Sequence, residues 1–397
     1  MHLRLGFVDV VVAASASVAA QFLKVHDSNF SSRPPNAGGK YVAYNYHDIV
    51  FAPYGPRWRL LRKISSVHLF SAKALDDFRP VRQEEVRVLV GALASAKTKV
   101  NLGQLLHLCN VNALGRMMMG QRLFGDGSGS VNPQADEFKS MVVELLELSG
   151  VFNIGDFIPA LESLDLQGVQ GGKLTDIEIK ALLLNMFIAG TETTPSTVEW
   201  TMAELIRHPM IMARVHQELD SVVGLDRLVS ELDLPNLTYL QAVMKETFRL
   251  HPAAPMSLPR IAADSCEING YHIPKGATLL VNVWAIGRDP NEWSDPLEFR
   301  PERFLPGGEK PNADVKGNDF EIIPFGAGRR ICAGMSLGLR MVQLMTAALV
   351  HAFDWELADG LLPEKLNMEE GPGLSLRRME PLMVYPRPRL SKHAYST

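Results

Sequence analysis

Apolar residues recur along most of this 397-residue chain with the spacing of helices rather than of strands. The strongest pattern runs from Ile177 to Arg207 and is apolar nearly all round, which is typical of a helix that passes through a protein core. Thr175 and Glu178 have the spacing of a capping box, in which each side chain binds a free backbone N–H at the start of a helix. Further helices are predicted from Pro56, which suits a first helical position, and over Met335–His351.

Short apolar runs predict a few strands. Val8–Ala13 is predicted as a strand that turns into a helix over Ser15–His26, and Thr278–Val283 as a strand in the Pro-rich C-terminal part. No internal repeat is present, and helix outweighs strand. The sequence therefore predicts a mainly α fold with small β-sheets, in a single domain of residues 1–397.

The long helix contains two residues that oppose helix formation. Gly190 lowers helix stability by about 1 kcal/mol, and Pro195 lowers it by about 3 kcal/mol and leaves a carbonyl without its donor. A core helix that carries both is predicted to be kinked there, and such kinks often lie at functional sites.

Composition excludes several classes of protein. The chain is 46% hydrophobic and 21% charged, which excludes wholesale disorder, and its 44 acidic and 40 basic residues give a net charge of −4. Because no long basic run is present, nucleic acid is not an expected partner. The three cysteines, Cys109, Cys266 and Cys332, are far apart, which argues against a disulfide scaffold or a structural zinc site and fits a reducing compartment.

No segment has the roughly 18–20 uninterrupted apolar residues that a membrane helix needs. The nearest, Phe7–Ala20, contains Asp9, and with Arg4 before it the segment also resembles a weak signal peptide. A strand that turns into a helix is the better interpretation. The chain is expected to be soluble or only peripherally attached to a membrane.

The most specific motif is the glycine-rich run Phe325–Gly334, FGAGRRICAG, which presents Cys332 at the start of a helix. Backbone N–H groups and the positive end of a helix favour thiolate over thiol, and Arg329 and Arg330 add positive charge. A single thiolate cannot build a zinc site, but it can be the one protein ligand of a haem iron. The alternative is a buried cysteine in a Gly-rich turn.

This run resembles the cysteine loop of the cytochrome P-450 family of haem–thiolate monooxygenases, Phe-x-x-Gly-x-Arg-x-Cys-x-Gly, at every fixed position. The resemblance implies the cytochrome P-450 fold, with a long central helix over the haem, and haem b (iron-protoporphyrin IX) as the cofactor. It also implies that Cys332 is the metal ligand. Further cofactor-binding residues by this resemblance are Phe325, Gly326, Gly334, Arg330, Trp58, Arg62 and Arg260, of which the arginines and Trp58 would bind the haem propionates. Taken singly, the arginines would be ordinary surface residues.

Two further segments match structural motifs of the family. Glu246-Thr247-Phe248-Arg249 matches its Glu-x-x-Arg helix, and Pro301–Phe304 matches the segment that supplies a second arginine. Glu246 and Arg249 share a helix face, so they can pair, and Arg303 would complete a buried cluster. The alternative for Glu246 and Arg249 alone is a surface salt bridge.

The segment with the predicted kink matches the oxygen-activation motif of the family, Ala/Gly-Gly-x-Asp/Glu-Thr-Thr. The resemblance implies that Gly190 leaves room for O2 above the iron, that Thr193 holds the hydrogen bond that directs protons, and that Glu192 relays protons from solvent. Simple helix polarity is the alternative. Pro195, directly after the motif, is a departure that is expected to affect the placement of the threonine.

The implied reaction inserts one oxygen atom of O2 into a C–H bond or an aromatic position, because a thiolate ligand favours O–O cleavage. Electrons are expected from NADPH through a separate NADPH–cytochrome P-450 reductase, since the chain contains no GxGxxG or Walker loop.

Longer stretches resemble plant members of the family that hydroxylate the flavonoid B-ring at the 3′ position; these stretches are residues 33–46, 51–70, 151–169 and 305–315. The expected substrate is therefore a flavonoid. Residues expected by this resemblance to face it are Phe187, Ala189, Ala254, Leu258 and Leu374. Ordinary core packing is the alternative for each of them.

The chain also departs from these relatives. Met1 aligns inside the first sheet, so the N-terminal membrane anchor is expected to be absent. The resemblance implies the cytosolic face of the endoplasmic reticulum membrane, and without the anchor the cytosol is the alternative location. Gly168–Lys173 runs directly into the predicted start of the long helix, which predicts an internal deletion of helices that form part of the distal roof of the substrate pocket.

Other functions remain open at this point. The deletion favours a truncated, catalytically impaired haem-binding remnant. A haem–thiolate enzyme that acts on another phenolic substrate, or an isomerase or dehydratase that uses no O2, would keep the fold, although such isomerases tend to lose the acid–threonine pair. Gly334–Gly338 also has the G-x-S-x-G spacing of serine hydrolases, but no strand is predicted directly before its serine.

Overall fold

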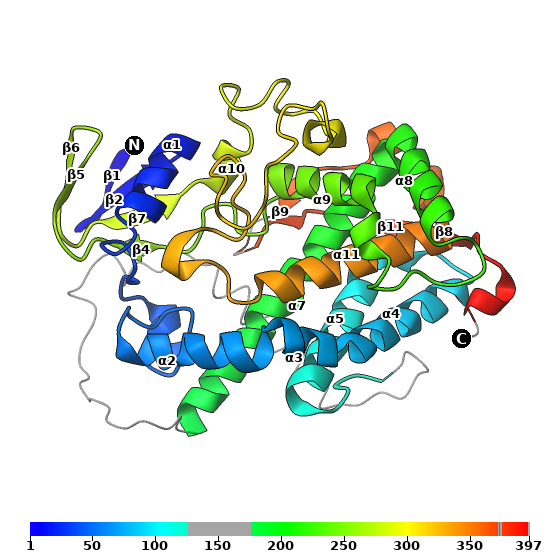
Figure 1. Ribbon diagram of the computed structural model, residues 1–397, viewed down its shortest axis with the longest axis horizontal. Helices are drawn as coiled ribbons and strands as arrows, with labels where there is room; N and C mark the ends of the chain where they lie inside the picture. Colours follow the sequence, from blue (N-terminus) through cyan, green and yellow to red (C-terminus); the bar gives the residue numbers. More distant parts are fainter. Residues whose placement is uncertain (126–175, 372, 374, 396–397) are drawn as a thin grey trace.

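About half of the described residues of the computed structural model are helical. The helices pack around one long helix, α7 (Asp176–Arg207), which crosses the molecule (Figure 1). The structure describes residues 1–125, 176–371, 373 and 375–395. The other α-helices of these residues are α1 (Ala16–Ala20), α2 (Pro56–Ile64), α3 (Ala72–Asp77), α4 (Arg79–Ala94), α5 (Leu102–Met119), α8 (Pro209–Val222), α9 (Thr238–Leu250), α10 (Val283–Ile286) and α11 (Met335–Ala352).

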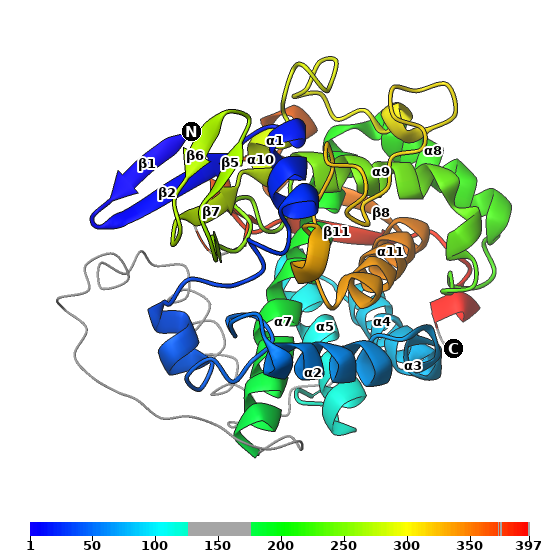
Figure 2. The ribbon, with the colours of Figure 1, turned by 60° about the vertical axis from the view of Figure 1, so that its left-hand side comes forward.

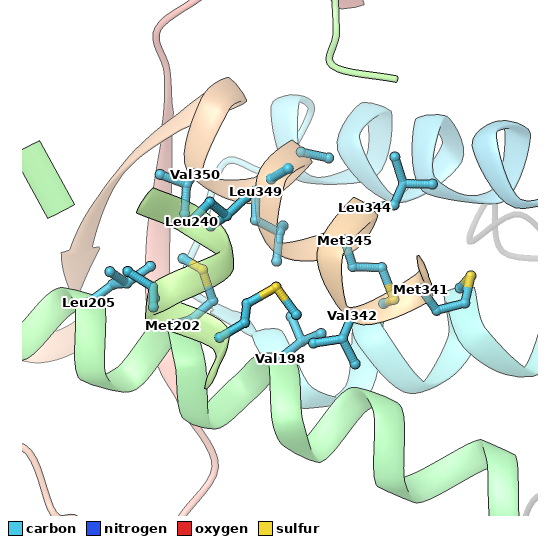
Figure 3. Close-up of a cluster of buried hydrophobic side chains, with 14 of the residues drawn as sticks. Val198, Met202, Leu205, Leu240, Met341, Val342, Leu344, Met345, Leu349 and Val350 are labelled. Atoms are coloured by element: carbon cyan, nitrogen blue, oxygen red, sulfur yellow. The ribbon is translucent and has the colours of Figure 1, made fainter. Parts of the chain in front are cut away.

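The main core lies where α7 meets α9 and α11. Val198, Met202 and Leu205 of α7 are buried with Leu240 of α9 and a row of α11 side chains that includes Met345 (Figure 3). Helix α5 packs along α7, and α4 packs against α5. The predicted core helix is thus enclosed by helices along most of its length, which explains why it is apolar nearly all round.

The strands form small sheets. The largest has the order β1 (His2–Leu5), β2 (Val8–Ala13), β7 (Thr278–Val281), β4 (Arg260–Ile261), in which β2 and β7 are parallel and the other pairs antiparallel. Together with the hairpin of β5 (Cys266–Ile268) and β6 (Tyr271–Ile273), it lies on the side of the molecule away from α4 and α11 (Figure 2). The remaining sheets are β3 (Val100–Asn101), β11 (Met383–Pro388), β8 (Phe353–Leu357), and the pair β9 (Glu370–Gly371), β10 (Arg377–Arg378).

Most of the predicted elements are confirmed. The strand Val8–Ala13 and the helix beginning at Pro56 are present as expected, and the C-terminal helix ends one residue later, at Ala352. The strand predicted over Thr278–Val283 ends at Val281, and the first helix continues from α1 as a wider helical turn. Among the described helices, α11 alone has the length and apolar character of a membrane span, but 67% of it is buried inside the protein, as in a core helix.

The long helix runs without interruption through Gly190 and Pro195. Thr175 lies outside the described residues, as does the predicted deletion at Gly168–Lys173. Glu178 is fully buried and its carboxylate binds the guanidinium of Arg57 in α2, with His47 Nδ1 3.9 Å from Oε1. The glutamate predicted as a helix cap therefore joins the start of α7 to α2.

Candidate functional site

The cysteine loop turns sharply in front of α11. Gly328 has a φ of +68°, in the left-handed region that favours glycine. A Cβ atom at Gly328 would also lie 2.4 Å from both Asp27 Oδ1 and the Leu23 carbonyl oxygen, so no other residue fits. These contacts fix the loop against the N-terminal part of the chain and place Cys332 immediately before α11.

Protein surrounds Cys332 closely enough to desolvate its thiol. The residue is nevertheless exposed. Burial raises the pKa of the Cys332 thiol, whereas the backbone N–H groups of Gly334 and Met335 and the nearby guanidinium of Arg62 lower it. The Cys332 N–H donates to the Phe325 carbonyl at 3.0 Å, which closes the loop. An accessible sulfur surrounded by N–H donors fits a thiolate ligand to a metal.

The middle of α7 has one accessible face. Ala189 is exposed and Thr193, one turn later, is half-buried, although Thr194 to Val198 are buried. Thr193 Oγ1 donates to the Ala189 carbonyl at 2.8 Å. Glu192, the other predicted proton carrier, is also half-buried. The predicted catalytic threonine therefore lies on the part of the helix that a bound molecule can reach.

Gly190 has a packing role that its sequence motif did not predict. Its carbonyl accepts a hydrogen bond from Asn110 Nδ2 of α5 at 2.6 Å. A Cβ atom at Gly190 would lie 2.8 Å from Leu114 Cδ1 of the same helix. The missing side chain thus lets α5 approach α7 closely, and the predicted role of Gly190 above the iron stays a prediction.

The predicted structural cluster forms as expected. Glu246 is fully buried, and Arg249 of the same helix donates to it at 2.6 and 2.7 Å. Arg303 donates to Glu246 Oε1 at 3.2 Å and to Glu309 at 2.6 Å. Arg249 also donates to the Gly287 carbonyl at 2.6 Å. The two guanidinium groups tie α9 to the loops that precede the cysteine loop.

The three predicted haem-binding arginines lie around the cysteine loop. Arg62 and Arg260 each donate to a backbone carbonyl of this loop at 2.8 Å. Arg330 donates to the carbonyls of Ser31 and Ala52 at 2.6 and 2.5 Å. The structure therefore brings together arginines from three separate parts of the chain.

Arg33 is a member of this group that the sequence did not reveal. Its guanidinium donates to the Val50 carbonyl at 3.0 Å and to the carbonyls of Leu258 and Pro259 at 2.7 Å each. Burial, and the neighbouring Arg260 and Arg330, lower the pKa of Arg33 well below its usual value. No local motif marks Arg33, because all its partners are backbone atoms distant in sequence.

Trp58 lies beside Arg330, and its predicted role toward a propionate stays a prediction. Its indole N–H donates to the Ile49 carbonyl at 2.9 Å, and the Arg330 guanidinium lies over its ring at 4.5 Å from the centroid. A propionate would have to compete with Ile49 for this donor. In the structure, Trp58 supports Arg330.

The charges around the cysteine loop fit an anionic cofactor. Burial lowers the pKa of Arg260 and of Arg330 to about 10 each, and repulsion from Arg260 adds to the effect on Arg330. The opposing carboxylates are Asp27 for Arg260 and Asp48 for Arg33 and Arg330. Arg260 Nη1 is buried and lies 3.5 Å from Asp27 Oδ1, but it makes no hydrogen bond among the described residues. Haem, with two carboxylates and an iron that takes one thiolate, matches this set of donors.

The predicted substrate-facing residues differ in their surroundings. Phe187 is buried, Ala189 is exposed, and Ala254 and Leu258 are half-buried. Leu374 lies outside the described residues. Ala189 lies one helical turn before Thr193, and all of these assignments stay predictions.

The fold and site together define a haem–thiolate protein: one accessible cysteine sulfur among N–H donors, a surrounding set of arginines and a long helix with an accessible face. The family model described as Cytochrome P450 matches residues 1–167 and 153–382. The chain belongs to the cytochrome P450 family. A solved zebrafish cytochrome P450 structure with progesterone has the same fold, with a TM-score of 0.83 at 24% identity over 98% of this chain and 96% of that chain.

Curated relatives are more similar in sequence. Flavonoid 3'-monooxygenase of Petunia hybrida is 65% identical over 100% of this chain and 86% of its own length. Flavonoid 3'-monooxygenase of Arabidopsis thaliana is 62% identical with the same coverage. The Petunia alignment extends over 443 positions, more than the 397 residues of this chain, so the relative carries residues with no counterpart here. The predicted position of the deletion, Gly168–Lys173, adjoins the overlap of the two matched family segments.

Proposed function

We propose that this chain hydroxylates the B-ring of flavonoids at the 3′ position, using O2 and electrons from NADPH delivered by a separate NADPH–cytochrome P-450 reductase. The observation that carries the proposal is the 65% identity to a flavonoid 3'-monooxygenase over the whole chain, combined with a complete cysteine loop. By the same likeness to plant relatives, we propose that the protein works at the cytosolic face of the endoplasmic reticulum membrane.

The residues of the cysteine loop would hold the cofactor. Bound haem supplies the activation of O2, in which one oxygen atom enters the substrate C–H bond and the other leaves as water. Cys332 would bind the iron, and the N–H groups of Gly334 and Met335 would keep its sulfur anionic. Arg33, Arg62, Arg260 and Arg330 would neutralise the propionates. Arg260 and Arg330 are buried, which strengthens their charge interactions with a bound carboxylate.

Thr193 would direct protons at the accessible face of α7. Its hydroxyl donates to the Ala189 carbonyl at 2.8 Å, so it can turn toward a bound oxygen molecule only by exchanging that acceptor. Glu192, next to it and half-buried, would resupply the proton from solvent. Of these two residues, only the threonine has to touch the reacting oxygen.

A catalytically impaired haem-binding protein is the second candidate function. It is favoured by one observation, the 443-position alignment to a chain of 397 residues, because the Petunia relative carries residues that have no counterpart in this chain. If the absent residues cover the substrate, the haem site would form while hydroxylation would be slow or absent.

Two measurements test the proposal. Reduced protein with carbon monoxide is expected to give the strongly red-shifted Soret band of a thiolate-ligated haem, and Cys332→Ser is expected to abolish it. Naringenin supplied with reductase and NADPH is expected to yield the 3′-hydroxylated product. A normal band without this product would overturn the hydroxylase in favour of the impaired protein, and a band unchanged in Cys332→Ser would overturn both.

A further inference from the structure

The carbonyl of Leu376 receives two hydrogen bonds from the central helix. Ser196 Oγ donates to it at 2.8 Å and Trp200 Nε1 at 3.1 Å. The N–H of Leu376 donates to the Ala253 carbonyl at 3.0 Å. Leu376, directly before β10, therefore binds α7 through its carbonyl and the segment after α9 through its N–H.

Ser196 differs from the neighbouring threonines in its hydrogen bond. Thr193, Thr197 and Thr201 each donate to the carbonyl four residues earlier in α7, at 2.8 Å. Such bonds stay within one helix and hold no other segment. Ser196 instead donates across to Leu376, although it lies on the same helix.

Trp200 makes a stacking contact through its ring in addition to the hydrogen bond from its indole N–H. It is fully buried, and its ring stacks on the imidazole of His251 with centroids 4.1 Å apart and an interplanar angle of 5°. Glu204 Oε1 lies 2.8 Å from His251 Nε2, and the Arg378 guanidinium lies 5.2 Å from the Trp200 ring centroid. His251 directly follows α9 and Arg378 belongs to β10, so the ring contacts the same two segments that Leu376 joins.

We infer that Ser196 and Trp200 are positioning residues for the substrate. Ser196 follows Thr193 by three residues, or about 4.5 Å along the helix. By fixing the Leu376 carbonyl, and through the Leu376 N–H the Ala253 carbonyl, both residues set how far the segment 253–258 lies from Thr193. This segment is expected to face the substrate, so its distance from Thr193 decides how the substrate ring is presented. The inference rests on the proposed function.

The test uses full-length holoprotein and three single variants. Ser196→Ala removes the hydroxyl, and Trp200→Phe removes the indole N–H but keeps an aromatic ring beside His251. Thr201→Val is the matched control, because it deletes a buried hydroxyl that bonds only within α7. The measurements, each per carbon monoxide-binding haem, are the dissociation constant of naringenin from the substrate-induced spectral shift, and the ratio of 3′-hydroxylated product to peroxide.

The Ser196 and Trp200 variants are each expected to raise the dissociation constant, by up to about fivefold if the whole free energy of the lost hydrogen bond is expressed in substrate binding, and to lower the product-to-peroxide ratio at least twofold. Thr201→Val is expected to change neither. If the dissociation constant and the product-to-peroxide ratio per haem are unchanged in both Ser196→Ala and Trp200→Phe, the inference is overturned, even when these variants yield less holoprotein. Equal effects in Thr201→Val would also overturn it. A wild type that binds naringenin without hydroxylating it would overturn only the proposed function, since the dissociation constants still decide the inference. A wild type that binds no naringenin would overturn both.

Discussion

Replacing Glu246 by glutamine is expected to remove much of the stability of this protein. Glu246 is fully buried, and its two oxygens accept hydrogen bonds from Arg249, from Arg303 and from the Arg300 backbone N–H at distances of 2.6–3.2 Å. Glutamine keeps one acceptor oxygen, but it removes the negative charge and turns an NH2 group toward guanidinium donors. Removing one partner of a buried ion pair costs about 3–5 kcal/mol, which is a large part of the roughly 5–15 kcal/mol by which folded domains are usually stable.

The assay compares Glu246→Gln with a surface variant, Asp77→Asn. Asp77 pairs with Lys73 at 2.7 Å on the exposed side of α3, so its loss is expected to have no measurable effect. The apparent melting temperature, followed by circular dichroism, and the yield of carbon monoxide-binding haem per milligram are expected to fall only in Glu246→Gln. If both variants melt with the wild type, the buried cluster does not hold α9 to the loops, and the reasoning is refuted.

Three further outcomes follow from the structure. Gly190→Ala is expected to lower stability by up to about 2 kcal/mol, because overpacking against Leu114 costs about 1–3 kcal/mol while alanine gains roughly 1 kcal/mol over glycine in a helix. In a Leu114→Ala background the contact at 2.8 Å is gone, so the same substitution is expected to be stabilising; equal effects in both backgrounds, measured by thermal melts, would disprove the packing role. Burial lowers the pKa of His251 despite the opposing Glu204, so the folded state resists its protonation, and stability is expected to fall as the pH drops below about 6.5. His251→Gln is expected to flatten that part of the melting profile, and identical slopes would contradict the assignment. Thr193→Ala is expected to divert electrons from product to peroxide, and unchanged coupling per NADPH consumed would exclude its proton-directing role.

The sequence predicted what depends on local spacing. Val8–Ala13 and the C-terminal helix are confirmed almost to the residue because period and length alone specify them. Glu246 and Arg249 were predicted to pair because they share one helix face, and the structure places them together. Cys332 precedes its helix as the glycine pattern indicated.

Other features depend on contacts that no local pattern encodes. The capping box of Glu178 with Thr175 stays a prediction, because Thr175 lies outside the described residues, and the ion pair of Glu178 with Arg57 of α2 was not foreseen. Arg33 joins the arginine group through backbone carbonyls far along the chain, and any residue type could supply those carbonyls. The close approach that requires Gly190 depends on Leu114 of a different helix. Sequence reasoning named candidate reacting residues from a motif, and these assignments stay predictions; it could not foresee the contacts that hold them.

The parallel pairing of β2 with β7 has a consequence for biosynthesis. Val10 to Ala13 lie beside Thr278 to Val281, so the N-terminal hairpin must wait for most of the chain to be translated. At roughly 5–20 residues per second, the ribosome needs on the order of tens of seconds to deliver the partner strand. Throughout that interval the edge of β2 that later pairs with β7 exposes backbone N–H and C=O groups without partners, and such edges are prone to pair with other nascent chains. Productive yield in a cell is therefore expected to depend on chaperones that shield the hairpin of β1 and β2 until β7 is made.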